Sequence, residues 1–208
     1  MGRYTGPACR LCRREGLKLY LKGEKCYAAS CAIEKRNYPP GQHSRSRGKT
    51  STYRLQLREK QKIKRIYGIM ERQFRRYFSI ANKFRGVTGT ILLQLLERRL
   101  DNVVYRLGFA SSRHQARQLV RHGNILVDGK KNNIPSYLLR QGQTVSVVEP
   151  LRENVFVRNA LEMTQVRGRM PWIEFNLNSW TGKFSYIPTR EEIPLDVKEQ
   201  LVVELYKK

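Results

Sequence analysis

The hydrophobic positions of residues 50–100 recur at the spacing of amphipathic helices. We expect one helix from Thr52 to Tyr67, with Thr52 as its N-terminal cap and Gly68 ending it. The next helix places four apolar residues on one face, at the spacing i, i+3, i+4 and i+7: Phe74, Tyr77, Phe78 and Ala81. These side chains are better explained as core than as stacking platforms for bases. Thr88 then caps a third, leucine-rich helix.

Residues 99–148 predict two short helices followed by a small antiparallel sheet. Asp101 is a candidate N-cap of the first helix, and Gly108 can take the left-handed conformation that ends it. Ser112, followed three residues later by Gln115, fits the capping pattern that starts a second helix. The β-rich runs and the turn that follow are Ile125–Val127, Asp128–Gly129 and Thr144–Val148.

The last 60 residues predict a further helix, a hairpin that joins the sheet, and a C-terminal helix. The helix and the two strands are expected at Asn154–Met163, Ile173–Leu177 and Lys183–Ile187. Thr181 and Gly182 mark the turn of the hairpin, and Asp196 with Glu199 matches a helix start. The pattern as a whole predicts an α+β fold with two helices on a small antiparallel sheet.

The chain of 208 residues is strongly basic, with 41 Lys and Arg against 17 Asp and Glu and a formal net charge of +24. Residues 1–100 hold 25 of the basic but only 6 of the acidic residues. Such clustering is typical of a phosphate-binding surface, with an anionic membrane as the competing interpretation. The sequence has no long amphipathic helix with bulky apolar anchors, no apolar run near the roughly 20 residues of a membrane span, and no signal-peptide pattern. We therefore expect a cytoplasmic protein that binds nucleic acid and no membrane.

All four cysteines lie in the first 31 residues, with the spacing C-x2-C-x13-C-x4-C: Cys9, Cys12, Cys26 and Cys31. Two close pairs joined by such a loop are typical of a zinc site, and disulfides do not persist in a reducing cytoplasm. Four thiolates leave no open coordination position, so we expect one structural zinc ion that folds a segment too small for its own core. The alternatives are a redox C-x-x-C, an iron–sulfur cluster, and a degenerate site with unpaired thiols.

One predicted helix carries an arginine at every fourth position, and we call Arg113, Arg117 and Arg121 the arginine ridge. Residues at this spacing stack on one helix face, where like charges repel by a few tenths of a kcal/mol per pair. A solvated helix face would be the ordinary explanation. The high net charge and the lack of an acidic residue on the ridge favour an outward-facing phosphate contact instead.

The segment Ser44–Ser51 is polar and basic, with Arg45, Arg47 and Lys49 at alternate positions. It has neither an apolar anchor nor an acidic residue, so it cannot bury enough surface to order itself. A flexible linker and an arm that orders on RNA explain it equally well. On an extended chain, alternating cations project to one side and could follow a single RNA strand.

Two runs of the central region, Arg98–Ala110 and Arg117–Gly123, resemble the RNA-binding module of the ribosomal protein S-four family. The module alone is shared by several RNA-modifying enzymes, so by itself it implies RNA binding and no more. The N-terminal runs Gly2–Tyr4, Cys9–Gly16 and Tyr38–His43 are similar to the cysteine-bearing members of the same family. The resemblance therefore covers nearly the whole chain.

The resemblance implies a helical domain with the module inserted in it, and a C-terminal helix that packs back on the N-terminal helices. In these terms residues 1–44 form a zinc-binding basic extension. The helical domain comprises residues 45–97 and is completed by 189–208. The RNA-binding module comprises residues 98–188, with its core at 99–148.

The resemblance further implies a structural constituent of the small ribosomal subunit, a primary ribosomal-RNA-binding protein that clamps several RNA helices, nucleates assembly and influences decoding accuracy. Implied partners are the small-subunit ribosomal RNA, the fifth small-subunit protein, and messenger RNA near its entry site. No Ser/His/Asp, Cys/His or paired-carboxylate constellation is found, so we expect no enzyme. The rival interpretations are an RNA-modifying or stress-related RNA-binding protein with the same module, and a zinc-finger DNA regulator.

The residues expected to contact RNA surround the cysteines or lie in the arm, in the first long helix and in the module. They are Arg3, Arg10, Arg13, Arg14, Arg45, Arg47, Lys49, Tyr53, Arg54, Arg58, Lys60, Arg99, Arg113, Arg117 and Arg121. Together they would hold phosphates of several RNA helices in a fixed relative orientation.

Overall fold

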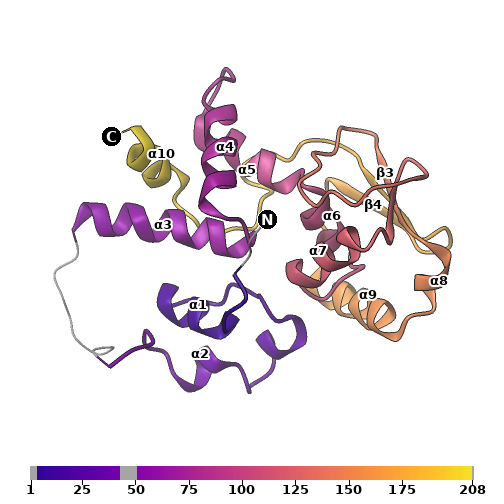
Figure 1. The fold of residues 1–208 in the computed structure, drawn as a ribbon, viewed down its shortest axis with the longest axis horizontal. Coiled ribbons are helices and arrows are strands. Elements are labelled where there is room, and N and C mark those ends of the chain that lie inside the picture. The colour runs from indigo at the N-terminus through magenta and orange to yellow at the C-terminus, as the bar shows by residue number, and fades with distance from the viewer. Residues whose placement is uncertain (1–3, 43–50, 208) are drawn as a thin grey trace. The chain divides into compact units, whose positions relative to one another are not determined.

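The computed structural model describes residues 4–42 and 51–207 and is drawn in Figure 1. The chain forms two compact units, one of residues 1–92 with 195–208 and the other of residues 93–194. Helix α5, Thr88–Glu97, contributes to both units. The boundaries expected from the resemblance, 97/98 and 188/189, lie within six residues of these. All of the predicted arm except Ser51 falls outside the described residues.

The first unit is helical. Its elements are α1 (Ala8–Glu15), the short 3-10 helix η1 (Gly23–Cys26), α2 (Ala32–Lys35), α3 (Thr52–Ile66), α4 (Glu71–Ala81) and α10 (Glu199–Lys207). The predictions of the helices α3, α4, α5 and α10 are confirmed, but Thr88, which was expected to cap α5, is already its first helical residue. The three elements before residue 36 were not predicted, because they are too short to show a hydrophobic period. No helix in the described ranges is long and apolar enough to cross a membrane.

Several of the predicted helix caps are wrong by one or a few residues. The cap of α3 is Ser51, whose hydroxyl accepts a hydrogen bond from the backbone N–H of Arg54 at 3.2 Å, and Thr52 is already helical. Asp196 does not cap α10, which begins at Glu199. A polar residue next to the true cap satisfies the same sequence rule, so the rule locates a helix start only to within a few residues.

The C-terminal helix α10 packs on α3 and α4, which confirms the implied return of the chain. The ring of Tyr206 lies with its centroid 4.6 Å from that of Phe78 and 6.2 Å from that of Phe74. The amide of Gln56 on α3 donates to the carboxylate of Glu204 at 2.9 Å. Because Phe74 and its three companions on α4 are buried, their assignment to the core is confirmed.

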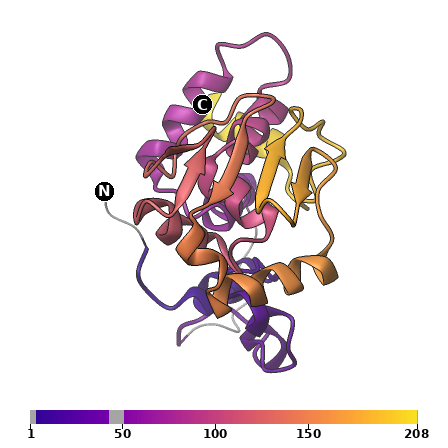
Figure 2. The ribbon, with the colours of Figure 1, turned by 90° about the vertical axis from the view of Figure 1, so that its right-hand side faces the viewer.

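The second unit packs helices on a five-stranded antiparallel sheet, seen in Figure 2. The strand order is β2-β1-β3-β5-β4. Its elements are α6 (Leu100–Leu107), α7 (Arg113–Arg121), β1 (Ile125–Val127), β2 (Lys130–Lys131), β3 (Thr144–Val147), α8 (Glu149–Arg152), α9 (Val155–Arg167), β4 (Ile173–Asn176) and β5 (Thr181–Phe184). The predicted α+β class, the two module helices and the added hairpin are confirmed.

The connection between α6 and α7 follows the predicted signals at its glycine and at its serine. Gly108 has φ +97°, and a Cβ there would lie 2.6 Å from the hydroxyl of Thr164 on α9, so the position requires glycine for both reasons. The hydroxyl of Ser112 caps α7 by accepting from the N–H of Gln115 at 3.3 Å. The side chain of Gln115 reaches back to the N–H of Ser111, one residue before the cap.

The sequence predicted that Gly182 lies in the turn of the hairpin, but it lies within the strand β5. Its backbone pairs with Val145 on one side and Phe175 on the other. A Cβ at this position would lie 2.0 Å from a methyl carbon of Leu107, so the helix side chain occupies the space above the glycine. The strand therefore starts earlier than predicted, since a glycine can mark close packing as well as a turn.

Candidate nucleic-acid interface

The four cysteines come together in the first unit. All are free thiols, and all four line one small cavity of about 10 Å³, with Leu21 and Ile33 among its apolar walls. Three of them are buried, and Cys9 is half-buried. Within residues 4–42 and 51–207, however, no three His, Cys, Asp or Glu side chains already stand in the arrangement of a metal-ligand set. The structure therefore shows that the four thiols share one cavity, whereas a bound metal ion stays a prediction.

Hydrogen bonding and burial both affect the thiols. The backbone N–H of Lys22 donates to the sulfur of Cys26 at 3.3 Å. Burial raises the pKa of Cys12 and of Cys26, and the other thiols of the cluster raise both further. A bound cation would lower the pKa of these thiols, because it favours the thiolate form. The donor set fits a metal that takes sulfur ligands.

The basic residues around the cysteines are partly available to a ligand. Arg10 and Arg14 are exposed on α1. The guanidinium of Arg13 donates to the carbonyl oxygen of Tyr38 at 3.0 Å and lies 4.8 Å from the centre of its ring, so this side chain ties the segment together. The remaining candidate, Arg3, lies outside the described residues.

A buried carboxylate joins α1 to α3. The side chain of Glu15 is 1% exposed and pairs with Arg65 and, at 3.4 Å, with Arg58. Burial raises the pKa of Glu15, and the two guanidinium groups oppose that rise. Burial also lowers the pKa of Arg58. The candidate Arg58 therefore holds the N-terminal segment on α3 in addition to any contact it makes with RNA.

The start of α3 is the most accessible part of that helix. Tyr53 is 59% exposed, and Arg54 is also exposed. Lys60, by contrast, is buried, and its ammonium group donates to Glu71 on α4 at 2.8 Å. The expectation that Lys60 faces RNA is wrong for this structure, because its charge is used between two packed helices.

Arg99 is also an internal residue. Its side chain has no exposed surface and forms a two-pronged pair with Asp101, with N–O distances of 3.0 and 2.6 Å. Asp101 therefore binds Arg99 and does not cap α6, whose first turn lacks a side-chain cap. A fully buried guanidinium cannot reach a phosphate, so the prediction for Arg99 is corrected.

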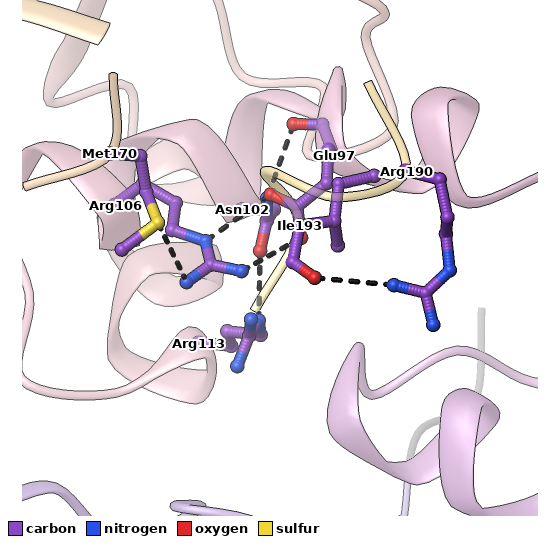
Figure 3. Close-up of polar contacts among 7 residues, drawn as sticks. All are labelled: Glu97, Asn102, Arg106, Arg113, Met170, Arg190 and Ile193. Carbon is purple, nitrogen blue, oxygen red and sulfur yellow. Dashed lines mark hydrogen bonds and ion pairs between the residues drawn. The ribbon is translucent and has the colours of Figure 1, made fainter. Parts of the chain in front are cut away.

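Arg113, the first member of the arginine ridge, points into the unit. It is 9% exposed, donates to the side-chain oxygen of Asn102 at 2.8 Å, and lies 4.5 Å from the ring centre of Tyr105. Figure 3 shows Arg113 close to the buried ion pair of Arg106 and Glu97. The side-chain amide of Asn102 also donates to the carboxylate of Glu97. The outward direction predicted for Arg113 is wrong.

The arginines of the ridge become more exposed to solvent towards its C-terminal end. Arg117 is half-buried and lies 3.5 Å from the carboxylate of Asp101, while Arg121 is exposed. The acidic partner of Arg117 is Asp101, which lies on the neighbouring helix α6. The sequence pattern of α7 alone therefore does not contain it. Of the three arginines, only Arg121 keeps the exposure that the sequence suggested.

A basic surface that was not predicted from the sequence lies on α4 and the turn that follows it. Its exposed cations are Arg72, Arg75, Arg76, Lys83 and Arg85. The signal was nevertheless present, because Glu71 is the only acidic residue between residues 60 and 96.

Comparisons with known proteins cover the chain from end to end. Residues 3–97 match the model of the ribosomal protein S4/S9 N-terminal domain, and residues 98–145 match the S4 domain. Three relatives, each called small ribosomal subunit protein uS4, come from Syntrophobacter fumaroxidans (61% identical), Thermodesulfovibrio yellowstonii (58%) and Thermus thermophilus (56%). In each case the match covers 100% of both chains. The protein therefore belongs to the family of small ribosomal subunit protein uS4.

Proposed function

We propose that the protein is a structural constituent of the small ribosomal subunit in the cytoplasm and binds ribosomal RNA directly. The observation that carries this proposal is identity of 54–61% to eight uS4 proteins over the whole chain. The net charge of +24 supports it, because neutralising RNA phosphates is the main source of sequence-independent affinity. On this proposal the protein works by binding and not by catalysis.

The mechanism would be a clamp on several RNA helices. Exposed cations lie on α1 and at the start of α3 in the first unit and at the end of α7 in the second unit, so each unit would bind phosphates of its own. A protein that fixes several RNA helices early would nucleate assembly of the subunit. The internal arginines contribute indirectly, since Arg58 and Arg113 hold the helices that carry the exposed ones.

The N-terminal segment would be held by one structural zinc ion. The ligands would be Cys9, Cys12, Cys26 and Cys31, which line the same cavity. When bound, zinc supplies four bonds to thiolates and so replaces the core that this short segment lacks. An iron–sulfur cluster with the same four ligands is the alternative that metal analysis distinguishes.

Further partners follow from the family alone. The fifth small-subunit protein and messenger RNA near its entry site would contact this chain, and through them it would influence decoding accuracy. The predicted messenger contacts are Arg45, Arg47 and Lys49. Replacing all three by Ala is expected to slow translation of structured messengers more than unstructured ones. Failure of subunit assembly would instead assign the arm to ribosomal RNA.

Equilibrium binding tests the main proposal against its rivals. The recombinant chain should bind small-subunit ribosomal RNA far more tightly than duplex DNA of the same length at matched salt. With about six phosphate contacts, affinity for the RNA should fall by roughly three decades between 50 and 200 mM salt. Equal affinity for the two nucleic acids would contradict the proposal and favour a non-specific or DNA-binding role.

Metal analysis tests the zinc proposal separately. Native protein should contain one zinc ion per chain, and Cys12→Ser should lose it together with the helical signal of α1. Leu17→Ala, in the same segment but outside the cavity lining, is the matched control and should keep the ion. A metal-free protein with an unchanged N-terminal segment would refute the site.

A further inference from the structure

The outward face of α4 is a basic surface that the functional assignment above does not use. Arg72, Arg76 and Ser79 follow each other at the spacing i, i+4 and i+7, opposite the buried Phe74 and Phe78. Arg75, next to them, has a side chain that is 70% exposed and lies 3.7 Å from Glu71. The helix therefore directs three guanidinium groups away from its own core.

The acidic residue on this helix is already engaged elsewhere. Glu71 accepts hydrogen bonds from Lys60 at 2.8 Å, Lys64 at 3.1 Å and Tyr206 at 2.8 Å. These donors stabilise the carboxylate and hold the pKa of Glu71 at about 2 even though burial acts in the opposite direction. Its charge is thus largely balanced within the core, and the outward arginines keep a net positive field.

The turn between α4 and α5 (Figure 1) follows this surface in the chain and carries an exposed aromatic residue. Phe84 is 58% exposed and sits between two exposed cations, Lys83 and Arg85. The turn is not a loose loop, because the backbone N–H groups of Lys83 and Phe84 donate to the carbonyls of Ile80 and Ala81 at 3.0 and 3.3 Å.

The combination of ring and cations points to a particular chemistry. A phenyl ring held on the surface costs hydration free energy, and in a basic groove such a ring serves as a stacking platform for a base. Phosphates on either side of a stacked base would meet Lys83 and Arg85. A hydrophobic protein partner would bury the ring equally well but would need several acidic groups to match the surrounding cations.

We propose that the outward face of α4 and its following turn form a contact for unpaired RNA. One base stacks on Phe84, the phosphates beside that base bind Lys83 and Arg85, and phosphates further along the strand bind Arg72 and Arg76. This inference rests on the proposed function and adds a specific contact to it. The duplex parts of the RNA would supply phosphates only, whereas the base must come from a bulge, a loop or a single strand.

Substitutions at position 84 separate stacking from simple apolar contact. Phe84→Leu keeps an apolar side chain but removes the ring, and it should weaken binding to small-subunit ribosomal RNA by about 5-fold to 150-fold. Phe84→Trp keeps a stacking face and should bind as the native protein does. Val87→Ala is the matched control, because Val87 is 70% exposed in the same turn and carries no ring.

A second variant tests the contribution of the cations to RNA binding. Replacing Arg72, Arg76 and Lys83 together by Ala should reduce the slope of log affinity against log salt by about 2, since each phosphate contact contributes about 0.7 to 0.9. The charge-preserving variant with Arg72→Lys, Arg76→Lys and Lys83→Arg should leave that slope unchanged. Ultraviolet crosslinking of the complex should place a nucleotide on the peptide that contains Phe84.

The outcomes that overturn the inference differ from those that overturn the proposed function. If the native chain binds the ribosomal RNA tightly and Phe84→Leu binds equally well without a crosslink at this peptide, the contact does not exist and the proposed function stands. Equal losses for Phe84→Leu and Phe84→Trp would also refute stacking. If the native chain does not prefer the ribosomal RNA to duplex DNA, the proposed function itself fails.

Discussion

Removal of the buried carboxylate of Glu97 should destabilise the second unit severely. Its side chain has no exposed surface and accepts from Arg106 at 2.8 and 3.2 Å and from Asn102 at 2.7 Å (Figure 3). Asn102 in turn accepts from Arg113 on α7 at 2.8 Å. The carboxylate therefore links the end of α5, the helix α6 and, through Asn102, the helix α7.

The expected cost follows from the charge that remains. In Glu97→Gln, the guanidinium of Arg106, whose side chain is 7% exposed, loses its carboxylate. Breaking a buried ion pair by removing one partner costs about 3–5 kcal/mol, several times the cost of an ordinary surface change. A second substitution, Arg106→Met, removes the buried charge as well and should restore part of the lost stability.

Urea unfolding followed by tryptophan fluorescence is a suitable assay. The chain has two tryptophans, and both, Trp172 and Trp180, belong to the second unit, so the signal reports on this unit. Trp172 is fully buried and lies 6.0 Å, measured from its ring centre, from the guanidinium of Arg106. Glu162→Gln, at an exposed position of α9, is the matched control and should change stability by less than about 0.5 kcal/mol.

Two results would refute this reasoning. A cost for Glu97→Gln no larger than that of Glu162→Gln would show that water or a neighbouring group compensates the buried charge. A double variant, Glu97→Gln with Arg106→Met, that is less stable than the single variant would show that packing around Arg106 matters more than its charge.

Three further substitutions have defined outcomes. Gly182→Ala should lower the free energy of unfolding by about 1–3 kcal/mol, because its methyl group would collide with Leu107, and an unchanged urea midpoint would contradict the packing described. Glu71 has its pKa lowered to about 2, so its ion pairs stabilise the fold above pH 4.5 and are lost as the pH falls towards 2. Glu71→Gln should therefore flatten the acid side of the stability profile measured by circular dichroism. An acid side equally steep in the native protein and in this variant would contradict the reasoning. Ser51→Ala should cost about 1 kcal/mol through loss of the α3 cap, and a thermal midpoint equal to the native one would show that the cap contributes nothing.

The sequence by itself determined the order and kind of the longer elements. Helical spacing identified the core face of α4, and the two positive φ angles of Asp128 and Gly129 match the turn that this dipeptide predicted between β1 and β2. These features depend on neighbours within a few residues, so they can be read locally. The resemblance added the return of α10 to the N-terminal helices, which no local pattern contains.

Only the tertiary structure decided which charges are available to a ligand. The arginine ridge looked free of acidic residues because Asp101 lies on another helix, yet that carboxylate binds both Arg99 and Arg117. Lys60 is likewise paired with Glu71, 11 residues further along the chain. The physical reason is that a long basic side chain is neutralised by whatever packing brings beside it, and packing joins residues that helical periodicity does not relate.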